Sequence, residues 1–185
     1  MDLVRDIVRR SKQIMSKPIV VDSLKLTRDR QRVSGAILVA GLPRLTESLL
    51  GNSGTFDYTV AGDVDQLERP VLRLQVSGVV QLQCQRCLES LAQAVAIDTT
   101  LRLVAAEALD AEYEAVGDDP DEPDCIAASS ELDVAALIED EVLLALPSHP
   151  RHAEGVCVAK VAGANGGGSN ENVTPFSVLA TLKIK

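Results

Sequence analysis

A chain of 185 residues with 46% hydrophobic residues is long enough to bury an aliphatic core without disulfide bonds. Aromatic residues make up only 2% and tryptophan is absent, so there is no obvious platform for stacking bases and any RNA contact would be mainly electrostatic. The net charge of −9 argues against a uniformly basic nucleic-acid binder, yet residues 1–45 carry ten Lys and Arg against four Asp and Glu (+6), which leaves −15 for residues 46–185.

The first 17 residues predict an amphipathic helical extension. Apolar residues recur there at helical spacing, and Pro18 should end the helix. Arg5, Arg9 and Arg10 lie mostly off the apolar stripe, which makes them candidates for contact with nucleic acid. Arg86, farther along the chain between two cysteines, is a fourth candidate. The other interpretations are a membrane contact or a loosely docked helix with a solvated face, since two aspartates dilute the charge.

The middle of the chain predicts a sheet. Residues 55–64 alternate apolar and polar side chains, as a half-buried strand does. Two longer alternating runs, 71–83 and 91–103, are separated by a short loop, which predicts an antiparallel hairpin. Shorter elements are expected before them: strands at 19–21 and 33–40, a turn or short helix at 25–32, and a small helix at 43–50.

The loop of this hairpin carries Cys84 and Cys87. Cys84 shares the parity of the apolar row in the first strand, so it should point toward the core. A C-x-x-C pair in a hairpin turn is half of a zinc site, and His152 and Cys157 could supply the other half. Free thiols in the core remain an alternative. A redox pair is a weaker one, because no helix begins at the motif to activate a thiol.

Residues 107–124 hold nine acidic residues and no basic one, with prolines at 120 and 123. Unrelieved like charge resists packing, so this stretch predicts a solvated acidic loop. An acidic docking site for a partner is the alternative.

Residues 132–146 predict the strongest helix, with Asp133 near its start and Pro147 just past its end. At about 100° per residue, Glu141 falls inside the apolar face of this helix. A buried carboxylate is costly unless it is paired, and Arg86 beside the cysteines is the candidate partner. Otherwise Glu141 would reach solvent at the rim of a wider apolar face.

The end of the chain predicts a detached anchor. Residues 163–173 are a Gly-rich linker by composition, and residues 174–185 begin with Thr-Pro and supply an apolar stripe. We therefore expect a C-terminal docking helix that packs on the sheet or on a partner.

Three stretches resemble the YceD family, the large ribosomal RNA subunit accumulation proteins: LQCQRCLES, LDVAALIEDEVLLALPSHPRHAEGVC and TPFSVLATLK. They occur in the order expected for that family, and the resemblance as a whole covers roughly Pro18 to the C-terminus. The resemblance implies a ribosome-biogenesis factor needed for normal levels of large-subunit ribosomal RNA, with no catalytic residues. Matching positions are Cys84, Cys87, His152 and Cys157 for its cysteine and histidine pattern, and Glu139, Asp140 and Glu141 for its acidic helix motif. His149 and Cys125 do not match and are left out of the metal set.

We therefore expect an α+β fold in residues 18–162, an antiparallel β-sheet core with a covering helix near residues 132–146 and short terminal helices. No apolar run approaches the roughly 20 residues of a membrane span and no signal peptide is visible, so a cytoplasmic protein without a membrane partner is expected.

The expected function is non-enzymatic support of 23S ribosomal RNA accumulation or processing. Large-subunit ribosomal RNA or its assembly proteins are the expected partners, and zinc is the candidate cofactor. The alternatives are a thiol-disulfide or zinc-dependent enzyme, or a protein–protein adaptor without RNA contact.

Overall fold

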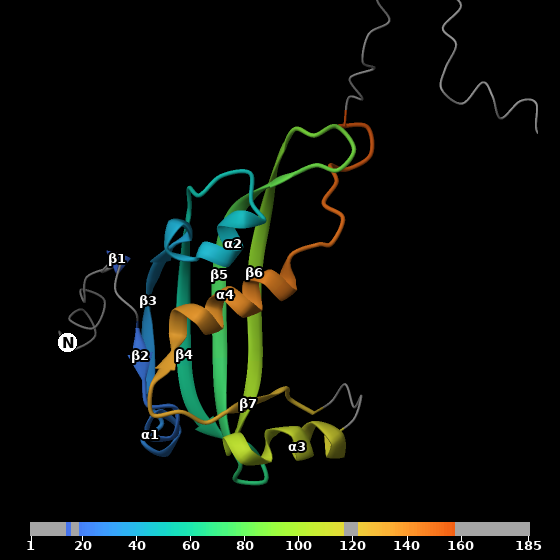
Figure 1. The fold of residues 1–185 in the computed structure, drawn as a ribbon. Coiled ribbons are helices and arrows are strands. Elements are labelled where there is room, and N and C mark those ends of the chain that lie inside the picture. Colours follow the sequence, from blue (N-terminus) through green and yellow to red (C-terminus); the bar gives the residue numbers. More distant parts are fainter. Residues whose placement is uncertain (1–13, 16–18, 117–121, 158–185) are drawn as a thin grey trace, which may run out of the picture.

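A six-stranded sheet with helices against one of its faces forms the body of the protein (Figure 1). The computed structural model describes residues 14–15, 19–116 and 122–157. The spatial order of the strands is β1-β3-β4-β5-β6-β7, and a separate pair joins β2 to β8. The strands are β1 (Ile14–Met15), β2 (Val20–Val21), β3 (Arg32–Leu38), β4 (Thr55–Val64), β5 (Pro70–Gln83), β6 (Ser90–Val104), β7 (Cys125–Ala127) and β8 (Leu132–Asp133). The predicted α+β class is confirmed.

The four central strands are antiparallel, as predicted, but the strand at each edge of the sheet runs parallel to its neighbour. β1 pairs in parallel with β3, and β7 pairs in parallel with β6. Each edge strand is joined to its neighbour by a long connection that contains a helix, and such a crossover brings strands together in parallel. The predicted antiparallel core is confirmed, and the two parallel edge strands are additions that the sequence does not indicate.

The predicted hairpin of β5 and β6 is confirmed, and it is the longest pairing in the sheet. Its register runs from Val71 opposite Arg102 to Gln83 opposite Ser90. Alternate β5 residues point to the helix-covered face and are buried, and Cys84 continues this row at the end of the strand. The periodicity of β5 thus carries Cys84 to the inner side of the hairpin loop.

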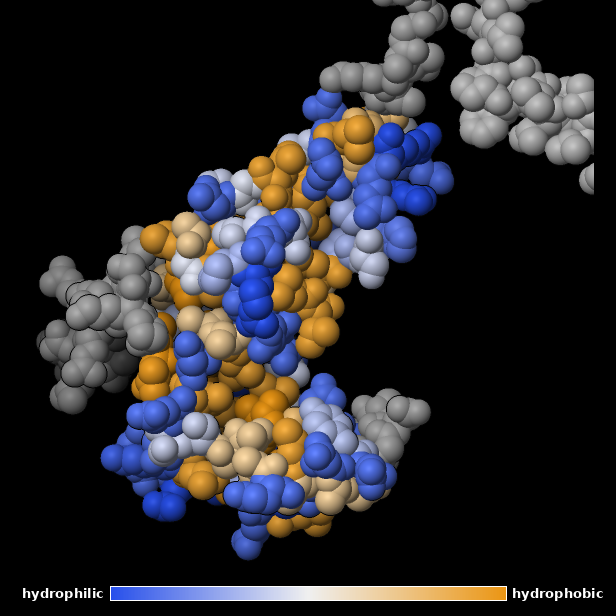
Figure 2. Space-filling view, viewed as in Figure 1, coloured by the Kyte–Doolittle hydropathy of each residue, from blue (hydrophilic) through white to orange (hydrophobic). Residues whose placement is uncertain are grey.

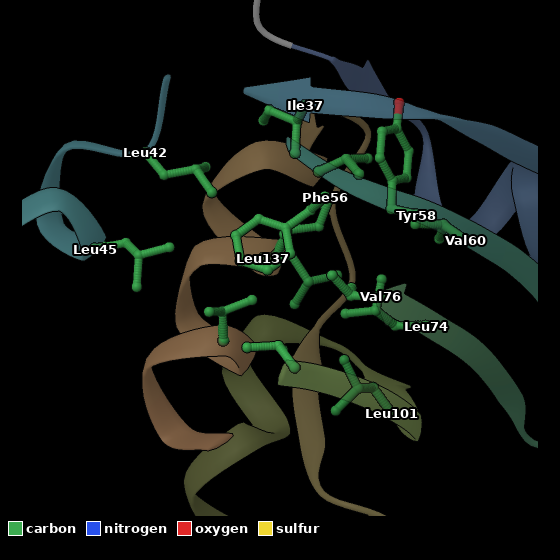
Figure 3. Packing of buried hydrophobic residues seen from close by; sticks show 14 of the residues in the cluster. Ile37, Leu42, Leu45, Phe56, Tyr58, Val60, Leu74, Val76, Leu101 and Leu137 are labelled. Atoms are coloured by element: carbon green, nitrogen blue, oxygen red, sulfur yellow. The ribbon is translucent and has the colours of Figure 1, made fainter. Parts of the chain in front are cut away.

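Helix α4 (Val134–Ala145) covers the inner face of the sheet, where the sequence predicts its strongest helix (Figure 3). Asp133 caps its start, because its carboxylate accepts hydrogen bonds from the N–H groups of Ala135 (2.9 Å) and Ala136 (3.3 Å). The buried residues Val134, Leu137, Ile138 and Val142 pack with strand residues such as Phe56, Leu74 and Leu101. α4 is too short to cross a membrane, and so is every other helix in the described part of the chain.

Helix α1 (Ser23–Arg28) packs tightly on β4 at the end of the sheet opposite the hairpin loop (Figure 1). Leu26 and Thr27 are buried, and the N–H of Gly62 donates to the carbonyl of Gln31 (2.9 Å). A Cβ added to Gly62 would come within 2.3 Å of the Leu26 carbonyl oxygen. Only glycine allows the backbone of α1 to approach β4 this closely.

Replacing Gly62 by alanine is expected to lower the free energy of unfolding by about 1–3 kcal/mol, because α1 would be pushed off the sheet. Urea unfolding followed by circular dichroism measures this loss. Gly41→Ala is the control, since nothing lies within 4 Å of a Cβ built there. Equal stability of the two variants would show that α1 does not pack on β4 in this way.

The outer face of the sheet is polar, and its clearest ion pair joins β5 to β6. The Arg73 guanidinium donates to both oxygens of Asp98 at 2.8 and 2.7 Å. These bonds, with a further one from Gln75, lower the pKa of the Asp98 carboxyl to about 2.

The stabilisation from Asp98 is therefore expected to be present above its unfolded pKa of about 4 and to be lost as the pH falls through about 2. In an NMR titration, Arg73→Gln should return the Asp98 midpoint toward about 4. A midpoint near 4 in the unaltered protein would contradict the pair.

The segment predicted as an acidic loop is helical in part. It contains a 3-10 turn at Ala106–Ala108 and helix α3 at Leu109–Val116. Arg102 at the end of β6 relieves the like charge, since it is buried and donates to Glu112 (2.7 Å). The Tyr113 hydroxyl also donates to the carbonyl of Cys125 (2.8 Å) and holds α3 against β7. The loop prediction is wrong for residues 109–116.

The terminal predictions lie mostly outside the described residues. Of the predicted N-terminal helix, residues 14–15 are described, and they form a strand rather than a helix. Their pairing with β3 along the sheet edge supplies hydrogen bonds that the helical pattern does not anticipate. The linker at 163–173 and the helix at 174–185 are outside the described part of the chain.

Candidate metal centre

The loop of the β5–β6 hairpin is docked against the segment that follows α4 (Figure 1). The Gln85 N–H donates to the carbonyl of Pro150 (2.9 Å), and the Gln85 side-chain amide donates to the carbonyl of Ser148 (3.2 Å). Within the loop, the Leu88 N–H donates to the Cys84 carbonyl (2.8 Å), and Leu88 takes a left-handed φ of 63°. This turn brings the sulfur atoms of the C-x-x-C pair to the same side of the loop.

Cys84, Cys87, His152 and Cys157 meet at this junction, as the sequence analysis predicts. Their candidate ligand atoms all lie within 4.8 Å of one another. The two sulfur atoms of Cys84 and Cys157 are 3.8 Å apart, and the Cys87 sulfur is 3.4 Å from Nδ1 of His152. Cys84 is fully buried and Cys157 is buried, so the cluster lies at the edge of the core.

The spacing of these donors fits a tetrahedral zinc ion. Zinc–sulfur bonds of about 2.3 Å at tetrahedral angles place two sulfur ligands about 3.8 Å apart. The distance between the sulfurs of Cys84 and Cys157 has that value. Three thiols and one imidazole are a donor set that zinc takes in structural sites.

A hydrogen bond on the far side of the ring orients His152 for a metal. Its Nε2 lies 3.1 Å from the carbonyl oxygen of Ser90. A carbonyl can only accept, so Nε2 carries the proton, and in the neutral ring Nδ1 presents its lone pair to the cysteines. This arrangement is typical of metal-binding histidines.

The electrostatics of the cluster favour one thiolate at Cys84. Burial raises the pKa of this thiol, but the N–H groups of Cys87, His152 and Arg86 directed at its sulfur outweigh burial and lower the pKa to about 5. Burial, together with hydrogen bonds to the thiols of Cys87 and Cys84, raises the pKa of Cys157 to about 11. Three thiols in one place ionise together only when a cation compensates their charge.

The two residues left out of the metal set stay apart from the cluster. Cys125 lies on β7 opposite Arg102, at the end of β6 away from Ser90. His149 is exposed and is not part of the cluster.

The predicted pair of Glu141 with Arg86 is absent from the ion pairs of the described residues. Burial, followed by the carboxylates of Asp124 and Asp140, raises the pKa of Glu141.

The buried carboxylate of α4 is Glu139, for which the resemblance to the YceD family implies only a place in the acidic helix motif. It accepts from Nε of Arg44 (2.9 Å) and from the N–H of Leu45 (3.0 Å) in helix α2 (Pro43–Glu47). Asp140 accepts from the same arginine at 2.6 Å. The acidic motif therefore anchors α2 over the sheet.

Of the four predicted candidates for nucleic-acid contact, the structure describes one. Arg86 is exposed on the hairpin loop next to the cysteines. Arg5, Arg9 and Arg10 lie outside the described residues.

Comparison with known proteins places the site in a family. The sequence model of "Large ribosomal RNA subunit accumulation protein YceD" matches residues 72–183, a span that includes the hairpin, α4 and the four clustered side chains. The chain belongs to the YceD family.

A YceD relative of Haemophilus influenzae, named large ribosomal RNA subunit accumulation protein YceD, is 30% identical over 179 residues. The alignment covers 94% of this chain and 99% of that protein. Similarity to YceD therefore extends over nearly the whole chain, further toward the N-terminus than the three motifs indicate. No solved structure matches the chain.

Proposed function

We propose that this chain is a non-enzymatic ribosome-biogenesis factor that supports the accumulation or processing of 23S large-subunit ribosomal RNA. Membership of the YceD family supports the proposal, because a relative that aligns over 94% of the chain is named for the accumulation of the large ribosomal RNA subunit. Such a role would be exercised in the cytoplasm, on large-subunit ribosomal RNA or on its assembly proteins.

We further propose that Cys84, Cys87, His152 and Cys157 hold a structural zinc ion. When bound, zinc would compensate the thiolate charge and join the hairpin loop to the segment after α4. Four protein donors fill a tetrahedral shell, whereas catalytic zinc keeps a position for water or substrate. The closed donor set supports a structural role over a zinc hydrolase.

A thiol oxidoreductase is less well supported by the same geometry. Redox C-x-x-C pairs have an accessible thiol activated at a helix N-terminus. Here Cys84 is fully buried, and the motif leads into strand β6. A third thiol and an imidazole approach the pair, and such a set of four donors supports metal binding over thiol exchange.

Depletion of the protein tests the proposed function. Cells without it are expected to show less 23S relative to 16S ribosomal RNA, and the gene encoding the unaltered chain should restore the ratio. The gene for Cys84→Ser should restore it poorly at elevated temperature, because the zinc would be lost. An unchanged ratio after depletion would overturn the proposed function.

A further inference from the structure

Four basic side chains gather at the end of the sheet that lies opposite the metal cluster. Helix α1 presents Lys25 and Arg28 three residues apart, so they lie on the same side of the helix. Arg30 follows in the turn, and Arg32 begins β3. All four are exposed, and the hydrophilic surface over α1 appears at the lower left of Figure 2. We call these four residues the α1 basic patch.

The α1 basic patch differs in its ion pairs from four other arginines of the described residues. Arg44, Arg69, Arg73 and Arg102 each contact a carboxylate within 2.9 Å. Within the described part of the chain, Lys25, Arg28 and Arg32 have no ion pair. Arg30 has one long contact to Asp63 (3.5 Å), with both side chains more than 60% exposed. Arg86 and Arg151 are also without an ion pair among the described residues, but they lie near the hairpin loop at the other end of the sheet. The α1 end is where four basic side chains come together, with Asp22 and Asp29 at the caps of the same helix.

Arg30 occupies a backbone position that normally takes glycine. The Gln31 N–H donates to the Leu26 carbonyl (2.9 Å) and the Arg30 N–H to the Thr27 carbonyl (3.1 Å). These two bonds form a Schellman motif, in which the residue after the cap is left-handed and most often glycine. Arg30 has a φ of 46°, so a long cation is kept where glycine would relieve backbone strain. Glycine at this position would therefore remove the charge of Arg30 and keep the turn.

The patch also stands on a rigid base. Leu26 and Thr27 are buried between the basic positions, and Gly62 fixes α1 against β4. The four cations are therefore held on a fixed surface rather than on a mobile loop. A fixed array of cations suits the repeated charges of a phosphate backbone.

We propose that the α1 basic patch binds the phosphate backbone of RNA, independently of base sequence. This inference rests on the proposed function, which supplies ribosomal RNA as the ligand. Electrostatic contact agrees with a chain that has 2% aromatic residues and few side chains on which bases could stack. The negative remainder of the chain would keep other faces away from the phosphates and so orient the protein on the RNA.

The test measures binding of the full chain, purified without chelators, to large-subunit ribosomal RNA transcribed in vitro, over a range of salt concentrations. The variant Lys25→Gln/Arg28→Gln/Arg32→Gln is expected to bind roughly ten-fold or more weakly at physiological salt, with a salt slope lower by about 2–3. Arg30→Gly should weaken binding without lowering the midpoint of thermal unfolding, since glycine suits the left-handed position. Arg73→Gln removes one charge from the outer face of the sheet and should bind as the unaltered chain does.

The outcomes separate this inference from the proposed function. If the triple variant binds RNA as tightly as the unaltered chain, the patch is not the phosphate site, while the depletion result still stands. If the unaltered chain binds no RNA, the inference is wrong and a protein partner would carry the function. Vesicles rich in phosphatidylglycerol form a second arm, and patch-dependent binding to them in preference to RNA would overturn the inference by identifying a membrane as the ligand.

Discussion

Replacing Cys84 by serine is expected to remove zinc from the protein and to cause the largest loss of stability of the changes considered for this chain. Cys84 is fully buried at the junction of β5 and the hairpin loop, and its sulfur is 3.8 Å from that of Cys157. A ligand that binds only the folded state at about a thousand times its Kd contributes about 4 kcal/mol. In a chain of this size, the loss would lower Tm by roughly 10 °C.

The cause of that loss can be separated from the cost of a buried serine. Addition of a chelator to the unaltered protein should lower Tm by a similar amount, and the chelator should have little effect on Cys84→Ser. Cys125→Ser is the matched control, because Cys125 is also buried but lies on β7 outside the cluster. It should keep one zinc per chain. Retention of zinc in Cys84→Ser, or its loss from Cys125→Ser, would assign the metal to other residues.

Replacing Glu139 by alanine is expected to lower the free energy of unfolding by about 3 kcal/mol. The change leaves the buried N–H of Leu45 without its acceptor and removes the carboxylate that holds Nε of Arg44. Helix α2 would then lose its polar anchor on α4. Chemical denaturation measures the loss, and Glu139→Gln should lose less because its amide oxygen can still accept from Leu45.

Asp140→Ala is the matched control for Glu139→Ala. Asp140 pairs with the same arginine, but its side chain is 54% exposed whereas that of Glu139 is 5% exposed. Exposed pairs contribute about 0–1 kcal/mol, so Asp140→Ala should change stability little. Equal losses in the two variants would mean that Glu139 is not the buried acceptor of α2.

The hairpin and the site at its tip follow from local sequence patterns. Strict alternation in β5 fixes which residues face the core, and that parity continues to Cys84. The C-x-x-C spacing then indicates a metal half-site, while Asp133 marks the start of α4. These features could be predicted because each depends on neighbours that are close in the chain.

The misassigned features depend on residues far apart in sequence. On α4, the helical period places Glu141 inside the apolar face, yet Glu139 is the buried carboxylate because α2 covers that side. The partner of Glu139 is Arg44, 95 residues away, and nothing local in the sequence identifies it. Likewise, Arg102 sits on the polar row of β6 but is buried by α3. The local periodicity of a helix or strand does not show which of its polar residues will be buried by an element that is distant in sequence.

Zinc-edge X-ray absorption of protein purified without chelators is the most direct test of the proposed zinc site, which would join the hairpin loop to the segment after α4. One zinc per chain is expected, with three sulfur ligands at about 2.3 Å and one nitrogen at about 2.0 Å. The His152→Ala variant should lose the nitrogen and keep the sulfurs of Cys84, Cys87 and Cys157. Protein without zinc, or zinc bound mainly by oxygen, would contradict the account.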